Sequence, residues 1–333
     1  MSNTGVRGAG PVASTFVRVA LAALALFAAT CASSTPPPNV PKPICSIDTT
    51  VGMDKAPRDR VFPPAYWFVL LVDGYQSSGV ITRPSKDCRG FPLRQDGEGC
   101  SGELPAELAP VPLTQRDLVV VSLGDARRLV WVITDRLPDG QGQGPIAIVE
   151  IGVHGVGVRA IGTLRTYPEN VALRLERVGA STVLVAEGEK CAGTGADCER
   201  AVRLLPLLGD RFVSKPIVDD HNACLGSAFF PVRTKGGIGH RTSTNYELEA
   251  ALVFGPDSIT VREQLAISDG HGSSTTEQSG GAFVTRVQAD RTLTINGGTV
   301  VANGPSLLDR WLAQHGTGAG GLSPPADQPS LRK

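Results

Sequence analysis

The chain of 333 residues has no excess of charge of either sign, because 32 Lys and Arg residues balance 32 Asp and Glu residues. Without a positive excess no overall field attracts phosphate, which disfavours a nucleic-acid binder. The longest apolar run, residues 19–29, has 11 residues, whereas a membrane-spanning helix needs about 20. The sequence also lacks a Walker loop, an HExxH motif, an EF-hand pattern, a dinucleotide fingerprint and a Gly-x-Ser-x-Gly elbow.

Glycine and proline, in contrast, are abundant, with 39 and 25 residues. Both residues interrupt helices, so this content excludes a coiled coil. A hydrophobic fraction of 41% with no net charge excludes disorder along the whole chain. The composition therefore indicates a folded chain of one large domain or two small ones.

The first 30 residues have the features of a secretory signal. They carry Arg7 and Arg18 and no acidic residue, and the run 19–29 matches the apolar core of about 7–15 residues in such signals. A stretch with five prolines, residues 32–43, follows at once and separates this segment from the rest. We interpret residues 1–30 as a signal peptide and expect export.

The end of this leader, residues 26–31 (LFAATC), resembles the processing site of bacterial lipoprotein precursors. The family prefers a branched apolar residue three positions before the cysteine and Gly or Ala directly before it, whereas this chain has Ala28 and Thr30. The resemblance implies that Cys31 carries acyl chains and that a membrane of the bacterial envelope is a partner. The alternative is cleavage after Ala32, which leaves no anchor.

Without Cys31 the number of cysteines is even, and export implies an oxidising compartment, so we expect three disulfides. The six candidates are Cys45, Cys88, Cys100, Cys191, Cys198 and Cys224. Short spacing favours two local pairs, Cys191–Cys198 and Cys88–Cys100, which leaves Cys45 with Cys224. The spacings are wider than those of paired zinc ligands, so we expect neither a metal nor another cofactor.

Short β-rich runs separated by Gly, Asp and Pro predict an all-β fold, either an antiparallel β-sandwich or barrel-like sheets. Residues 66–72 (YWFVLLV) are read as the first of these strands, and residues 306–315 as one short C-terminal helix. The expected organisation is a signal peptide (1–30), a Pro-rich tether and domain entry (31–60), a first β region (61–216), a loop-rich connector (217–244), a second β region with the helix (245–315) and a disordered tail (316–333).

The densest polar cluster is Asp219, Asp220 and His221, shortly before Cys224. Two carboxylates and an imidazole suit metal binding or acid–base catalysis, with His240 as a further candidate. Asp and Asn also favour surface turns, and we expect a turn. The aromatic run 66–68 predicts either core packing or an exposed binding patch, and core is the commoner case.

For each of these motifs, a structural role such as a surface turn or core packing is favoured over a catalytic one. We therefore expect an exported, lipid-anchored envelope protein that acts as a non-catalytic binding or interaction module. Two alternatives stay open: an exported hydrolase using Asp219, Asp220 and His221, and a purely structural envelope component. The sequence does not identify a protein or small-molecule partner.

Overall fold

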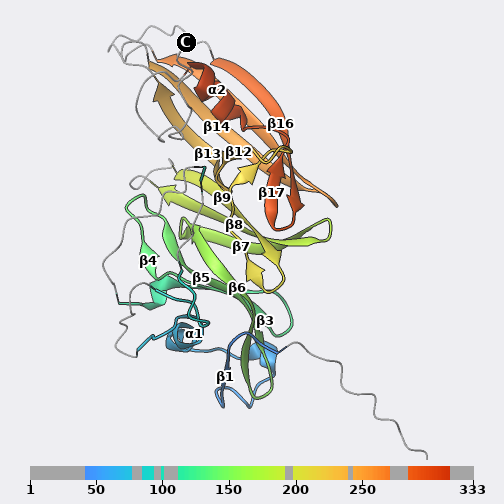
Figure 1. The fold of residues 1–333 in the computed structure, drawn as a ribbon. Helices are drawn as coiled ribbons and strands as arrows, with labels where there is room; N and C mark the ends of the chain where they lie inside the picture. Colours follow the sequence, from blue (N-terminus) through green and yellow to red (C-terminus); the bar gives the residue numbers. More distant parts are fainter. Residues whose placement is uncertain are drawn as a thin grey trace, which may run out of the picture. The chain divides into compact units, whose positions relative to one another are not determined.

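The computed structural model describes residues 42–76, 85–93, 99–100, 112–191, 198–238, 243–270 and 284–315. These residues form strands joined in one largely antiparallel system, together with two α-helices (Figure 1). The predicted all-β class is confirmed. The expected signal peptide, Cys31 and the tail 316–333 lie outside the described residues.

A first group of strands follows the order β2-β3-β5-β6-β1, with every pair antiparallel. The short strand β4 pairs with the start of β5. The bounds are β1 (Ser46–Asp48), β2 (Leu118–Ser122), β3 (Arg127–Val132), β4 (Asp135–Arg136), β5 (Gly142–Ile151) and β6 (Gly155–Thr166). Two 3₁₀ turns, η1 (Pro57–Asp59) and η2 (Gln115–Asp117), precede β2.

A second group follows the order β7-β8-β9-β13-β14-β15-β16-β17-β11-β12, with one parallel pair, β11 with β17. Strand β10 connects the two groups, because Arg211 pairs with Ile161 of β6 and with Leu208 of β9. The bounds are β7 (Glu169–Val178), β8 (Ser181–Cys191), β9 (Cys198–Leu208), β10 (Arg211–Phe212), β11 (Ile217–Val218), β12 (Cys224–Gly226), β13 (Phe229–Ile238), β14 (Ser243–Phe254), β15 (Ile259–Gly270), β16 (Val284–Asn296) and β17 (Thr299–Ala302).

Strands β8 and β9 are buried on both faces, since successive side chains of a strand point to opposite sides. One face joins a central core with strands of the first group; it contains Leu129, Trp131, Ile146, Leu164, Leu184 and Leu205. The other face joins a second core with β13 to β17; it contains Val183, Val185, Val202, Leu204, Val261 and Leu293. Burial on both faces explains why residues 183–186 (VLVA) of β8 form a continuous apolar run rather than an alternating one.

The first helix, α1 (Pro64–Leu71), corrects the expectation of a strand at residues 66–72. Pro63 and Pro64 open it, and a proline in the first turn costs no hydrogen bond because that N–H has no helical partner. Trp67, Phe68 and Leu71 are buried against β3, β5 and β6 in a third core. A short apolar run fits a strand or a buried helix equally well by periodicity, and here the prolines decide.

The segment 217–244, expected as a loop-rich connector, holds β11, β12 and β13. Strand β13 pairs with β9 through its first half and with β14 from Arg233 onward. Its register against β9 shifts between Pro231 and Arg233, at the residue that has no N–H to donate. Pro231 and Gly236 resemble strand breakers in the sequence, although they lie inside a ten-residue strand.

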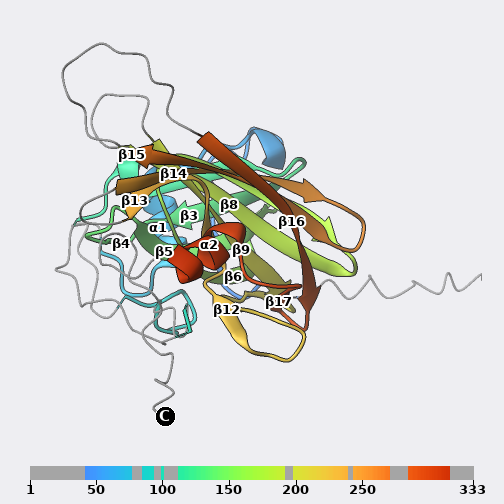
Figure 2. The ribbon, with the colours of Figure 1, turned by 90° about the horizontal axis from the view of Figure 1, so that it is seen from above.

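The expected C-terminal helix is confirmed as α2 (Leu307–His315). The Ser306 hydroxyl accepts the Asp309 N–H at 3.0 Å and caps the helix. Leu307, Leu308 and Trp311 pack against β14 and β15 in a fourth core (Figures 1 and 2). One end of the β14–β15 inner face thus meets this helix, and the other end meets β8 and β9.

All six expected disulfide cysteines are paired, but in a different pattern. Cys191–Cys198 is confirmed, whereas Cys88–Cys100 and Cys45–Cys224 are wrong: Cys45 pairs with Cys88 and Cys100 with Cys224. The cause is the packing around α1. Cys45 and Cys88 both contact the core beneath the helix. An isolated antiparallel β-bridge between Val72 and Asp87 brings Cys88 to this core.

The three disulfides are expected to differ in their contribution to stability. They close loops with sequence separations of 124, 43 and 7 residues. In the chain-entropy model these separations correspond to about 5, 4 and 2 kcal/mol. The double variant Cys100→Ser/Cys224→Ser should therefore lose more free energy of unfolding in urea than Cys191→Ser/Cys198→Ser does. Equal losses, or a Cys88–Cys100 peptide in a non-reducing digest, would contradict this assignment.

Candidate functional site

The predicted acidic cluster forms the turn between β11 and β12. Asp219 Oδ1 accepts the backbone N–H of His221 at 2.9 Å and that of Ala223 at 2.7 Å. Asn222 has φ = 62°, a left-handed conformation that asparagine tolerates well. The Asp219 carboxylate therefore closes the turn, and the disulfide at Cys224 holds the strand that follows.

The other two members of the cluster point into solvent. The side chains of Asp220 and His221 are 81% and 83% exposed, with 2.5 Å between Oδ1 and Nδ1. The three side chains lie close enough to share an ion, but such groups are common on surfaces without one. A catalytic site needs a supported, partly enclosed geometry, which this turn does not provide. The arrangement supports the structural interpretation of the cluster; His240 lies outside the described residues.

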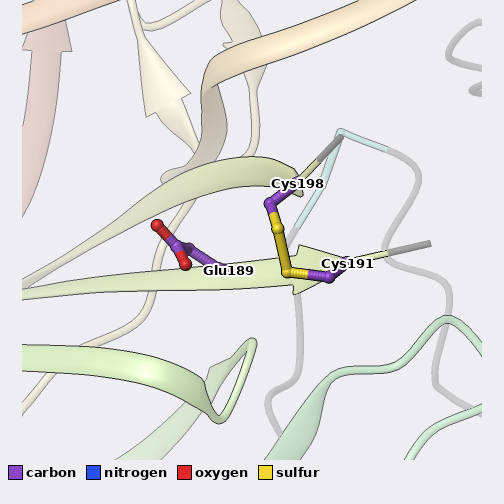
Figure 3. Close-up of side chains that lie close together, drawn as sticks. All are labelled: Glu189, Cys191 and Cys198. Carbon is purple, nitrogen blue, oxygen red and sulfur yellow. A yellow bond between two sulfur atoms is a disulfide. The ribbon is translucent and has the colours of Figure 1, made fainter. Parts of the chain in front are cut away.

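Glu189 and the disulfide Cys191–Cys198 lie together at the end of the β8–β9 hairpin where β8 ends and β9 begins (Figure 3). Glu189 accepts a hydrogen bond from Asn170 at 2.8 Å and pairs with Arg200 at 3.3 Å. A cysteine ligates metals as its thiolate, and sulfurs joined in a disulfide carry no such charge. In its oxidised form this cluster is a cross-strand clamp rather than a metal site.

A buried ion pair lies on the inner face of the second group, where the sequence analysis placed no site. The side chains of Glu263 on β15 and Arg291 on β16 are 3% and 6% exposed, with 3.7 Å between Oε1 and Nη2. Glu263 Oε2 accepts the N–H of Leu307, the first residue of α2, at 2.8 Å. Arg291 also stacks over the ring of Phe230.

Burial controls the ionisation of this pair. It raises the pKa of Glu263, an effect that Arg291 and the Leu307 N–H oppose. It lowers the pKa of Arg291, which Glu263 opposes. Desolvation is the larger influence on both pKa values, so the ion pair is not a strong source of stability. Its role is to fix the start of α2 over the sheet, through the hydrogen bond from the Leu307 N–H to Glu263. One sequence signal was available: Glu263 occupies a core position between Val261 and Leu265.

Tyr167 is a further buried titratable group. Burial, followed by the charges of Glu199 and Asp139, raises its pKa to about 12. The phenol therefore keeps its proton at neutral pH and does not act as a base there. Its ring packs edge-on against Phe229 and beneath the Lys190 ammonium, which is a packing role.

The aromatic run 66–68 joins the core rather than an exposed patch. Trp67 and Phe68 are buried, and Tyr66 is half-buried, with its hydroxyl donating to the Ile47 carbonyl at 3.4 Å. Burial raises the pKa of Tyr66 as well. The exposed apolar side chains of this region are instead Val61 and Val69, on either side of the run.

Comparison of the chain with protein-family models, with curated proteins and with solved structures finds no match. The functional inference therefore depends on the residues themselves.

The acidic turn yields a test that separates structure from chemistry. Asp219→Ala removes the acceptor of two backbone N–H groups and is expected to lower the free energy of unfolding by about 1 kcal/mol. Asp220→Ala and His221→Ala serve as matched controls, because these side chains are more than 80% exposed, and they should leave stability unchanged. Urea unfolding measures all three variants. Equal losses at the three positions would contradict the turn-closing role of Asp219.

The buried pair predicts a pH dependence of stability. A carboxyl whose pKa is raised by folding stabilises the folded state below the unfolded value, near 4.5, and loses that contribution as pH rises through the folded value. Glu263→Gln cannot titrate. The free energy of unfolding of the wild type minus that of Glu263→Gln should therefore fall as pH rises above 4.5. Chemical denaturation at several pH values measures this difference, and a flat or rising difference would contradict the prediction.

Proposed function

We propose that this chain is an exported protein of the bacterial envelope, anchored through acyl chains on Cys31, which acts as a non-catalytic binding or interaction module. The observation that carries the proposal is the cysteine balance. Six of the seven cysteines are paired with one another in disulfides, which leaves Cys31 alone, directly after the signal-like leader. An unpaired cysteine at that position suits lipid attachment.

Three disulfides indicate an oxidising location outside the cytoplasm. Among the helices of the described residues, none has the length and apolar character needed to span a bilayer. An acyl anchor would supply membrane attachment by burying CH₂ groups, at about 0.8 kcal/mol each.

A binding role is favoured over hydrolysis by the geometry of the acidic turn. The hydrolase alternative requires Asp219, Asp220 or His221 to converge with another polar group in an enclosed site. Asp219 instead bonds to the backbone of its own turn, and the other two side chains are more than 80% exposed. Nothing specific in the described residues favours a purely structural role over a binding one.

The anchor is tested by Cys31→Ser in a bacterial host. The variant is expected to lose labelling by a fatty-acid analogue and to move from the membrane fraction to the soluble fraction, because the sulfur that accepts the lipid is gone. The double variant Cys191→Ser/Cys198→Ser is the matched control: it also lacks cysteine sulfurs but should keep the label and the membrane association. Unchanged labelling and partitioning of Cys31→Ser would overturn the anchor.

A further inference from the structure

Four exposed apolar side chains lie on segments that meet near the start of the described chain. They are Val51, Met53, Val61 and Val153, with exposed fractions of 41%, 47%, 81% and 61%. We call these four residues the entry patch. Single exposed apolar residues are normal on a protein surface, but a group of them marks a contact site. We therefore expect the entry patch to contact another molecule or surface.

Arg60 holds the three segments of the entry patch together. Its side chain is buried, and Nη1 donates to the carbonyls of Gly152 and Val153, at 3.0 Å each. Its Nε donates to the Lys55 carbonyl at 3.3 Å. Gly52, between Val51 and Met53, lies directly against the aliphatic part of the Arg60 side chain. The loop after β1 and the β5–β6 turn thus meet at the side chain of Arg60, and Val61 follows Arg60 directly in the chain.

The entry patch adjoins the point at which the chain enters the fold. Pro43 lies against Gly157, the Ile44 N–H donates to the Val158 carbonyl, and β1 then pairs with β6. The Thr49 N–H donates to the His154 carbonyl at 3.0 Å, beside Val153. Figure 1 shows β1 next to β6 at this end of the strands. The loop that carries Val51 and Met53 follows directly.

The distance from Cys31 is limited by the covalent chain. Pro43 follows Cys31 by twelve positions, and a fully extended chain spans at most about 3.6 Å per residue, or about 43 Å in all. A lipid on Cys31 therefore keeps the entry patch within reach of the bilayer surface. The effective concentration of that surface at the patch is high, so weak apolar contacts suffice for binding.

The neighbouring surface favours an apolar contact over a charged one. Within residues 51–61 the exposed charges balance, with Lys55 and Arg58 against Asp54 and Asp59, and Arg58 pairs with Asp59 at 3.6 Å. The next element, α1, has the sequence PAYWFVLL and no charged side chain at all. Helices on a water-facing surface usually expose charged residues, but α1 exposes Ala65 and Val69.

We infer that the entry patch rests on the bilayer to which Cys31 anchors the chain, with its four apolar side chains at the boundary of headgroups and acyl chains. This inference rests on the proposed lipid anchor. Val61, the most exposed of the four, is expected to lie deepest in the bilayer. Because the local charges balance, the contact is expected to depend little on salt or on anionic lipid.

The experiment couples the chain to vesicles chemically, so that it does not depend on natural acylation. Mature protein, residues 31–333, has one free thiol, Cys31, which reacts with a maleimide phospholipid in vesicles of phosphatidylethanolamine and phosphatidylglycerol with brominated acyl chains. The compact unit of the fold begins at Pro43, so loss of the leader removes none of its internal contacts. Val61→Trp places a fluorescent reporter in the patch, and Val253→Trp on β14, at a valine that is 42% exposed, is the matched control.

The extent of quenching by the brominated acyl chains measures how deeply the introduced tryptophan lies in the bilayer. For penetration of several ångströms we expect roughly half of the fluorescence of Val61→Trp to be quenched and its emission shifted to the blue, whereas Val253→Trp stays unquenched. Adding Met53→Ser and Val153→Ser to Val61→Trp should reduce the quenching, with intact disulfides as the test of folding. The parent protein, whose tryptophans are buried, supplies the background.

Equal quenching of Val61→Trp and Val253→Trp would overturn the inference. So would a blue shift of Val61→Trp that depends on protein concentration without vesicles, because it would assign the entry patch to a second copy of the chain. The lipid anchor is tested separately by acylation of Cys31 in cells. Its failure would leave the quenching result intact, and the two failures are therefore distinguishable.

Discussion

The fold depends on two adjacent strands that are buried on both faces. β8 and β9 contribute Leu184 and Leu205 to the core shared with the first group of strands, and Val183 and Val202 to the core shared with the second group. Burying apolar surface on both sides of a single layer ties the two groups into one cooperative structure, because neither core can open without exposing part of these strands. Strand β10 and the two registers of β13 then connect the groups through backbone hydrogen bonds.

Much of the fold was predictable from the sequence, and the failures have identifiable causes. Hairpins such as β16–β17, with Gly297-Gly298 in the turn, follow from local turn chemistry. The helix α1 was missed because a short run of large apolar residues has no clear period. Strand β13 was missed because Pro231 and Gly236 suggest a break, whereas a bulge accommodates the proline.

The disulfide pattern shows a different limit. Nearness in sequence identified Cys191–Cys198, whose strands pair directly, but misassigned the other four cysteines. Loop-closure entropy grows only slowly with loop length, so spacing is a weak guide once tertiary packing brings distant segments together. The same holds for the sites. The acidic turn was visible as a motif, while the Glu263–Arg291 pair depends on the register of β15 against β16, and the entry patch arises only when loops far apart in sequence converge.

The pattern of disulfides also decides how the chain responds to proteolysis. A cut between Cys45 and Cys88, or anywhere between Cys100 and Cys224, leaves both pieces covalently joined. Release of material from a tethered chain is confined to cuts between Cys31 and Cys45, between Cys88 and Cys100, or after Cys224. For a chain anchored at Cys31 as proposed, a nick within either of these two disulfide loops would leave the protein attached, and shedding would be controlled by two short stretches and the C-terminal third of the chain.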